Sequence, residues 1–162
     1  MRAPELHVGV QDLAPGLWIW RTKHPGWKPD ADWQPVVTST FVESGGERLV
    51  LDPLAPAPDS EVWKRLDQHP PTAAVVLMPD HVRDVDVFVG RYGARGFGPM
   101  FFFPEDVPRT KLEPILADSK LPGGSVALYD GRGRLETPIW LPNHRVIVFG
   151  DALTERGGQL RV

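Results

Sequence analysis

The chain of 162 residues contains no cysteine. This absence excludes disulfides and thiolate metal sites, and it is consistent with the reducing cytoplasm, where we expect the protein to reside. A Gly-x-Ser-x-Gly sequence is also missing. Neither a cysteine nucleophile nor the serine elbow of the α/β-hydrolases is therefore favoured as the basis of an activity.

Long apolar runs and concentrated positive charge are lacking as well. No stretch approaches the roughly 18 apolar residues that a membrane helix needs, and residues 1–12 hold no apolar core of a signal peptide. The formal net charge is -3, and no basic stripe stands out. We therefore expect no membrane association and no nucleic-acid partner.

What the chain has in quantity is proline and glycine, with 18 and 16 residues. They divide the apolar segments into short elements joined by turns, within a length that suits a single domain spanning residues 1–162. The pattern predicts strands, then alternating strands and helices, then strands again. Expected helices cover about 60–69 and 83–92; expected strands are 16–21, 36–42, 48–51, 73–77, 100–103 (or a buried loop edge there), 125–129, 137–141 and 146–149.

Several of the predicted strands end at or next to polar residues. One ends at Asp52, one runs through Met78 into Asp80 and His81, and one ends at Asp151. In layered α/β folds, sites collect where strand ends and their following loops converge. We therefore expect the candidate functional residues of this chain at these strand ends.

The segment 75–85 reads Val-Val-Leu-Met-Pro-Asp-His-Val-Arg-Asp-Val. It resembles the apolar strand and Thr-His-x-His-x-Asp-His motif of metallo-β-lactamase-fold hydrolases, which a helix follows. In this ungapped frame, the first histidine of the motif falls on Pro79 and the second on His81. The aspartate falls on Arg83 and the last histidine on Asp84, so the motif is degenerate.

Further segments agree with the same frame, and the resemblance covers roughly residues 14–155. Residues 47–53 are similar to a family strand that ends in an aspartate. Residues 139–153 resemble the late hairpin whose Gly-Asp, here ending in Asp151, supplies the metal-bridging carboxylate. No histidine stands near Arg132, where the family has its third. Residues 16–18 and 24–29 also look like those of a poorly characterised bacterial subgroup that carries a variant motif.

The resemblance implies the α/β class and a metallo-β-lactamase-like αββα sandwich with mixed sheets, in a short or C-terminally abbreviated form. It also implies metal chemistry, in which one or two zinc ions lower the pKa of a bound water to about 7 and polarise the scissile group. The surviving candidates for catalysis and metal binding are His81, Asp84 and Asp151, with Asp52 and Asp80 as nearby carboxylates. One imidazole among carboxylates suits oxygen-preferring ions better than zinc. We expect no cofactor, or a single divalent ion of zinc, manganese or iron.

Arg83 stands where the family has a ligating aspartate, and a guanidinium cannot be deprotonated to make room for a cation. Our hypothesis is that Arg83 replaces the metal, with its planar fork bridging the carboxylates of Asp151 and Asp52. Candidate substrate-binding residues are Arg83, Asp80 and Trp27. Trp27 lies in a proline-rich loop that could form a pocket lid.

Plainer alternatives stand beside these roles. In these, His81 forms only a hydrogen bond with Asp151 or Asp52, and Asp84 acts only as a first-turn helix acid. Asp80 could cap a helix, and Asp52 could tether a loop through backbone hydrogen bonds. Two functions remain open: hydrolysis of an ester, amide or phosphate-type bond, or non-catalytic binding of a small molecule or a protein. Homodimerisation through an exposed sheet edge is a further alternative.

Overall fold

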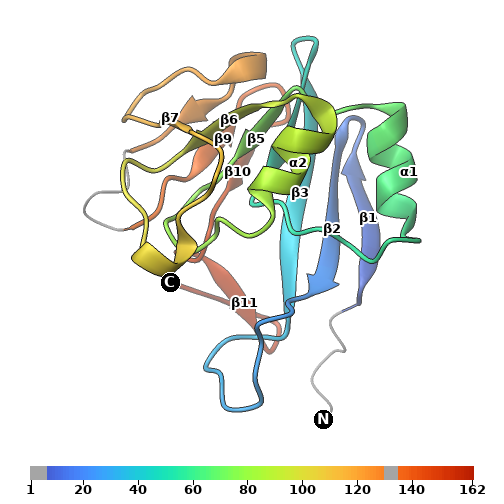
Figure 1. Cartoon of the computed structure of the whole chain (residues 1–162), viewed down its shortest axis with the longest axis vertical. Coiled ribbons are helices and arrows are strands. Elements are labelled where there is room, and N and C mark those ends of the chain that lie inside the picture. The colour runs from blue at the N-terminus through green and yellow to red at the C-terminus, as the bar shows by residue number, and fades with distance from the viewer. Residues whose placement is uncertain (1–6, 130–134) are drawn as a thin grey trace.

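A computed structural model describes residues 7–129 and 135–162 (Figure 1). Seven strands form one sheet in the order β1 to β7, antiparallel from β1 to β4 and parallel from β4 to β7. The parallel part is built by crossovers through two helices. The bounds of these elements are β1 Gly9–Ala14, β2 Leu17–Lys23, β3 Val36–Ser44, β4 Glu47–Leu51, α1 Glu61–Gln68, β5 Ala73–Val75, α2 Val85–Tyr92, β6 Arg95–Gly98 and β7 Glu113–Pro114.

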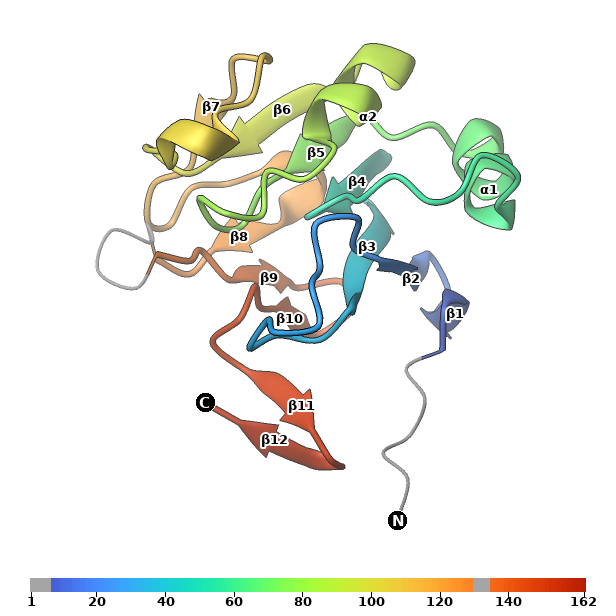
Figure 2. The same ribbon diagram turned by 60° about the horizontal axis from the view of Figure 1, so that its bottom comes forward.

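The C-terminal part adds a second, smaller sheet with the order β10-β9-β8 and a separate hairpin of β11 and β12. Figure 2 shows this hairpin projecting from the body of the molecule. Two single turns of 3-10 helix, η1 and η2, lie between the sheets in the sequence. The bounds are η1 Pro104–Asp106, η2 Pro122–Gly124, β8 Val126–Ala127, β9 Ile139–Leu141, β10 Val146–Val148, β11 Thr154–Arg156 and β12 Gln159–Arg161.

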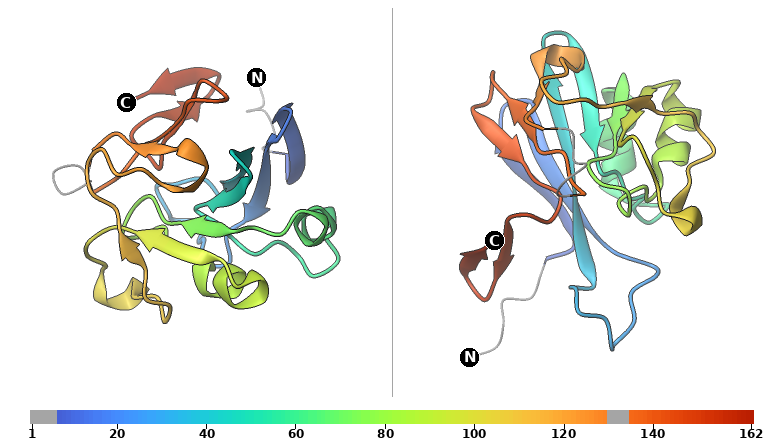
Figure 3. Two further views of the ribbon diagram at one scale, coloured as in Figure 1. Left: turned by 90° about the horizontal axis from the view of Figure 1, so that it is seen from above. Right: turned by 90° about the vertical axis from the view of Figure 1, so that its left-hand side faces the viewer.

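The large sheet is buried on both faces because its strands are apolar at consecutive positions. Side chains of a strand alternate between faces, so neighbours such as Leu49 and Val50 enter different cores. Leu49, Leu51 and Val75 pack against the small sheet, whereas Val50 and Ala74 pack beneath the helices. Figure 3 shows the resulting layers of helices, large sheet and small sheet. Among residues 7–129 and 135–162 no α-helix covers the outer face of the small sheet.

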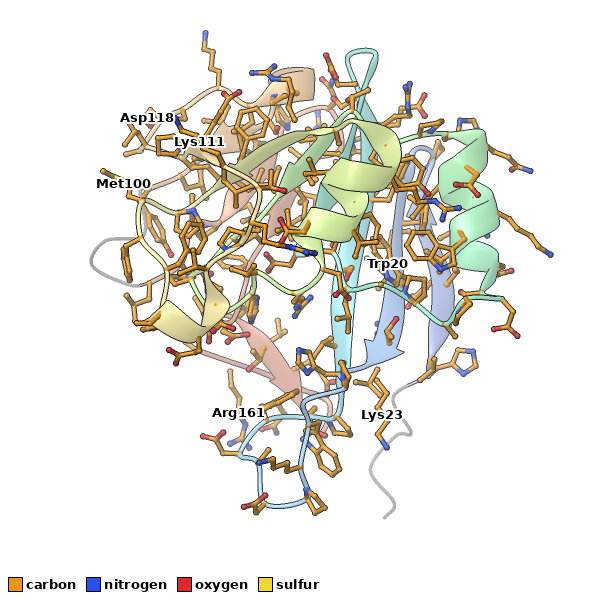
Figure 4. All side chains as sticks on the ribbon, viewed as in Figure 1. Trp20, Lys23, Met100, Lys111, Asp118 and Arg161 are labelled. Carbon is orange, nitrogen blue, oxygen red and sulfur yellow. The ribbon has the colours of Figure 1, made fainter. Side chains whose placement is uncertain are left out.

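Aromatic side chains fill the space between the large sheet and the helices. Trp20 is fully buried, stacks on Phe88 of α2 and donates its indole N–H to the Leu54 carbonyl at 2.9 Å. Figure 4 shows Trp20 in this layer. Trp63 of α1 stacks on the same Phe88 ring. Both helices are too short and too polar to cross a membrane, and no other helix in the described part of the chain could do so.

Of the two alternatives predicted for residues 100–103, a strand or a buried loop edge, the strand is wrong. The strand is β6, just before it, while Met100 is half exposed and the phenylalanines that follow lie in a loop. The sequence pattern does not predict β6 because Gly96 and Gly98 lie in it, and glycine is rare in strand interiors unless another group approaches closely. A Cβ on either glycine would lie within 2.7 Å of the Leu112 side chain. The sequence Gly131-Arg132-Gly133 also predicts a turn, which falls outside the described residues.

The turn at η2 joins the two sheets through Gly123. Its φ is +72°, and its carbonyl accepts a hydrogen bond from Ser44 Oγ at 2.7 Å, next to the β3–β4 turn. A Cβ on Gly123 would lie 2.6 Å from the Ser44 carbonyl oxygen. The adjacent Gly124 has a φ of +75°, but a Cβ there would meet nothing within 4 Å.

This difference gives a matched pair of substitutions. Gly124→Ala should lower the free energy of unfolding by about 1 kcal/mol, the penalty for a left-handed alanine. Gly123→Ala should lower it by about 3 kcal/mol, because the methyl group also collides with backbone. Urea unfolding of the two variants checks this, and equal losses would contradict the close approach at Gly123.

Candidate functional site

Three strand ends bring the predicted site residues together. Asp52 follows β4, the segment 76–84 follows β5, and Asp151 lies a few residues after β10. Because β4 and β5 run parallel, their carboxyl ends meet at one edge of the sheet, which is where such folds gather their sites. In Figure 1 this edge faces the end of the molecule that carries the β2–β3 loop and the β11–β12 hairpin. Lys23 and Arg161 mark the same end in Figure 4.

Asp52 is a buried carboxylate with both oxygens occupied. Oδ1 accepts the backbone N–H of Leu77 at 2.7 Å, and Oδ2 lies 2.7 Å from Nδ1 of His81. Its backbone is in the left-handed region, with a φ of +47°, and its N–H donates to the Val75 carbonyl. The expectation that Asp52 tethers a loop through backbone hydrogen bonds is confirmed, and Asp52 also orients His81.

His81 lies between two carboxylates and is only 14% exposed. Nδ1 contacts Asp52, while Nε2 lies 3.5 Å from Asp151 Oδ1. Burial by itself lowers the pKa of His81, but the charge of Asp52 and the hydrogen bonds to Asp151 and Asp52 outweigh it and raise the pKa to about 10. The ring therefore carries a positive charge at neutral pH when no metal ion is bound. Both carboxylates expected as partners of His81, those of Asp52 and Asp151, contact its ring.

His81 belongs to a group of three side chains close enough together to hold a metal ion. One ligand atom each from Asp80, His81 and Asp151 lies within 4.8 Å of the others, and this is the single such group within residues 7–129 and 135–162. Asp84 is outside it. The Asp84 carboxylate precedes α2 without capping it and instead accepts the backbone N–H of Ala55 at 2.7 Å. The structure thus brings His81 and Asp151 together with Asp80. The sequence alone predicts Asp80 only as a nearby carboxylate and a candidate substrate-binding residue.

Arg83 is held by backbone carbonyls. Its Nη1 donates to the carbonyl oxygens of Thr38 and Asp52, both at 2.7 Å. The predicted bridge to the Asp52 carboxylate is wrong, because Arg83 bonds the carbonyl of Asp52 while the carboxylate oxygens contact Leu77 and His81. Burial lowers the pKa of Arg83, against the opposing charges of the surrounding aspartates. Arg83 therefore ties the start of β3 to the end of β4 from the loop after β5.

The β2–β3 loop contributes a second histidine near the site. His24 Nδ1 accepts the backbone N–H of Gly26 at 3.0 Å, and its ring meets Trp33 edge-on at 5.1 Å. Burial and the charges of Arg83 and His81 lower the pKa of His24. Trp27 turns into its own loop, where Nε1 donates to the Trp33 carbonyl at 2.9 Å. A lid role for Trp27 thus stays a prediction.

Asp106, in η1, is a further acidic residue near Asp80 and His24, at the rim of the site. The sequence alone does not identify it. Burial raises its pKa, with further contributions from the nearby Glu105 and Asp80. Nothing around it in sequence resembles a motif, since residues 104–122 are irregular. His24 likewise offered only its place in a proline-bounded loop as a signal. Both residues join the site through tertiary structure, because each belongs to a different loop from His81.

The donor set fits one metal ion and not two. Three protein ligands are the usual number for a catalytic ion that keeps an open position, and one imidazole with two carboxylates meets that number. The site is open at the surface. Asp151 is 58% exposed, and neither of two surface hollows, of about 460 and 340 Å³, is lined by any residue of the group. Both hollows border α1 instead.

Comparisons with known proteins place this arrangement in a wider context. No protein-family model matches the chain, and no curated protein sequence matches it significantly. Solved structures do match. The FIM-1 metallo-β-lactamase from Pseudomonas aeruginosa, in its mono-zinc form, aligns with a TM-score of 0.61 at 13% identity over 86% of this chain and 68% of that one.

Two further structures give similar values. A metallo-β-lactamase from Hirschia baltica aligns with a TM-score of 0.62 at 15% identity, over 86% of this chain and 69% of that one. One from Erythrobacter litoralis aligns with a TM-score of 0.54 at 15% identity, over 96% and 70%. At such identities the likeness is one of backbone arrangement, and it agrees with the resemblance of segment 75–85. The chain has the metallo-β-lactamase fold.

Proposed function

We propose that this protein is a metal-dependent hydrolase with a single divalent-cation site formed by His81, Asp80 and Asp151. The reaction proposed is hydrolysis of an ester, amide or phosphate-type bond. One observation carries the proposal: Asp52 fixes His81 through Nδ1, which leaves Nε2 facing the carboxylate of Asp151. Metal-binding histidines are commonly held in this way, with the second ring nitrogen bonded to a carboxylate that sets the tautomer.

The charge around the site also supports a cation. Four carboxylates belong to it or to its rim, against the guanidinium of Arg83 and the imidazolium of His81. A net negative site attracts a positive ion and repels an anion. The proton on His81 stands where the ion would bind, so binding would release it. The four carboxylates are those of Asp52, Asp80, Asp106 and Asp151.

The ligand chemistry favours manganese or iron(II) over zinc, because carboxylate oxygens dominate the set. A bound cation of this kind supplies Lewis acidity, which polarises a scissile carbonyl or phosphoryl group and acidifies water. Single occupancy is consistent with the mono-zinc form of the similar P. aeruginosa enzyme. The residues of this chain hold the ion, orient His81 through Asp52, and leave Asp151 open to solvent for an incoming substrate.

A second candidate is non-catalytic binding by the same fold, with Arg83 taking the place of the metal. The observation in its favour is the partly buried guanidinium, which four aspartates stabilise electrostatically. The hydrogen bonds of Nη1 to two carbonyls favour a structural role instead. This alternative requires that no divalent ion binds at His81.

Titration with Mn²⁺ tests the metal site and its ligands. Wild-type protein dialysed free of metal should bind one ion per chain in calorimetry. His81→Ala, Asp80→Asn and Asp151→Asn should each weaken binding about tenfold or more, since each removes a ligand or the negative charge of one. Asp84→Asn is the matched control and should bind as wild type, because its amide oxygen can still accept the Ala55 N–H.

The outcomes separate the hypotheses. Loss of binding in Asp84→Asn but not in Asp80→Asn would restore the ligand set expected from the sequence. A wild type that binds no Mn²⁺, Fe²⁺ or Zn²⁺ would overturn the metal proposal in favour of the alternative. Hydrolysis of chromogenic ester, amide and phosphate substrates by the Mn²⁺-loaded wild type, absent in His81→Ala, would establish the reaction.

Substitution of Arg83 tests its structural role. Arg83→Ala should lower the free energy of unfolding by about 2–3 kcal/mol, because the Asp52 carbonyl loses a charged donor. It should keep a stoichiometry of one Mn²⁺ per chain. Arg109→Ala, at a side chain 90% exposed, is the control and should change stability by about 0.5 kcal/mol or less. Unchanged stability of Arg83→Ala in urea would contradict the role.

A further inference from the structure

Glu136 is a buried acidic residue outside the metal-ligand group. It is 2% exposed, and its Oε2 accepts the backbone N–H groups of Asp151 and Ala152, both at 2.7 Å. Its other oxygen, Oε1, is buried without a hydrogen-bond partner. The carboxylate thus binds the backbone of the turn that contains Asp151. Glu136 itself lies before β9, in a different part of the chain.

The surroundings of Glu136 connect this turn to the segment that carries His81. The next residue, Thr137, donates its N–H to the Leu77 carbonyl at 2.8 Å, which attaches the segment leading into β9 to the segment that follows β5. A Cβ on Gly150 would lie 2.6 Å from Met78 Sδ and 3.2 Å from Glu136 Oε2. Gly150, Met78 and Glu136 are therefore in close contact beneath the two ligand-bearing segments.

We propose that Glu136 is the positioning residue of this site: it fixes the backbone at Asp151 so that the Asp151 carboxylate faces His81 Nε2. The inference rests on the proposed metal site. A ligand must be held within about 0.5 Å of its productive place, and an exposed turn after a short strand does not hold it without support. Two charge-assisted hydrogen bonds to consecutive N–H groups supply that support.

Stability alone does not account for a carboxylate at this place. A buried carboxylate with one oxygen unpaired carries a desolvation penalty that an amide or an apolar side chain of similar volume would avoid. The negative charge of Glu136 lies beneath Asp151, where it adds negative potential behind the ligands and favours a cation in front of them.

Three variants separate positioning from general packing. Glu136→Ala removes both hydrogen bonds to the turn and should weaken Mn²⁺ binding about tenfold or more, as loss of an outer-sphere partner does. Glu136→Gln retains an oxygen that can accept both N–H groups and should restore affinity to within about threefold of wild type. Thr137→Val is the control. Its hydroxyl is buried and unpartnered, so its removal should leave Mn²⁺ affinity unchanged.

Amide hydrogen exchange in the metal-free protein provides an independent readout. The N–H groups of Asp151 and Ala152 should exchange about tenfold faster or more in Glu136→Ala than in wild type or Thr137→Val, because they lose their acceptor. Wild-type Mn²⁺ affinity in a folded Glu136→Ala, or unchanged exchange at both amides, would overturn the positioning role.

The two proposals fail in distinguishable ways. If the wild type binds no metal, the proposed function falls, and the positioning role is then decided by exchange at the two amides alone. If Glu136→Ala does not fold, Glu136→Gln decides instead: affinity and exchange near those of wild type support the hydrogen bonds, and a loss of both overturns rescue by an acceptor oxygen.

Discussion

The carboxylate of Asp52 is the interaction on which the site depends. One oxygen binds the backbone at the end of β5, and the other binds the ring of His81 in the loop that follows. The residue is 5% exposed, so an unpaired carboxylate there would be strongly unfavourable, and both contacts are thereby enforced. The position of the loop after β5 relative to the end of β4 follows from this one side chain.

Arg83 adds a second tie between the same elements, directed at the carbonyl of Asp52 instead of its carboxylate. Two side chains of the loop after β5 therefore bind the same residue: His81 contacts the carboxylate of Asp52, and Arg83 contacts its carbonyl. Both Asp52 and Arg83 have a φ of +47°, a conformation that non-glycine residues rarely adopt. Such strained backbone conformations persist only where the surrounding structure holds them, and they are typical of functional sites.

Much of the fold could be predicted from the sequence because its signals are local. The turn at Gly45 and Gly46, the capping of α1 by Ser60 and the left-handed Gly93 after α2 follow from residue types at fixed spacing. The motif frame around His81 could be aligned because it runs without a gap from a buried strand into a helix. Its Asp52 partner was among the expected ones, since both sit at strand ends.

What could not be predicted depends on side-chain direction and on long-range contacts. Asp80 and Asp84 flank His81 in sequence, and only the turn in which His81 N–H bonds the Met78 carbonyl brings Asp80 toward Asp151. The partner of Asp84 is a backbone N–H in a loop without any pattern. Strand β6 was missed because its glycines are needed for the close approach of Leu112, a reason that lies outside the strand itself.

The hydrogen bond between Thr137 N–H and the Leu77 carbonyl has a consequence for how the protein folds. It joins the segment leading into β9 to the segment that follows β5, so the site is closed by contacts between distant parts of the chain. Loop-closure entropy must be overcome before such contacts form, so we expect them to form after the hairpins of β1 to β4. The ligand cluster would then be complete only once these distant segments have met. A cation bound there would act as a latch on the completed fold, slowing its opening and stabilising the native state by mass action.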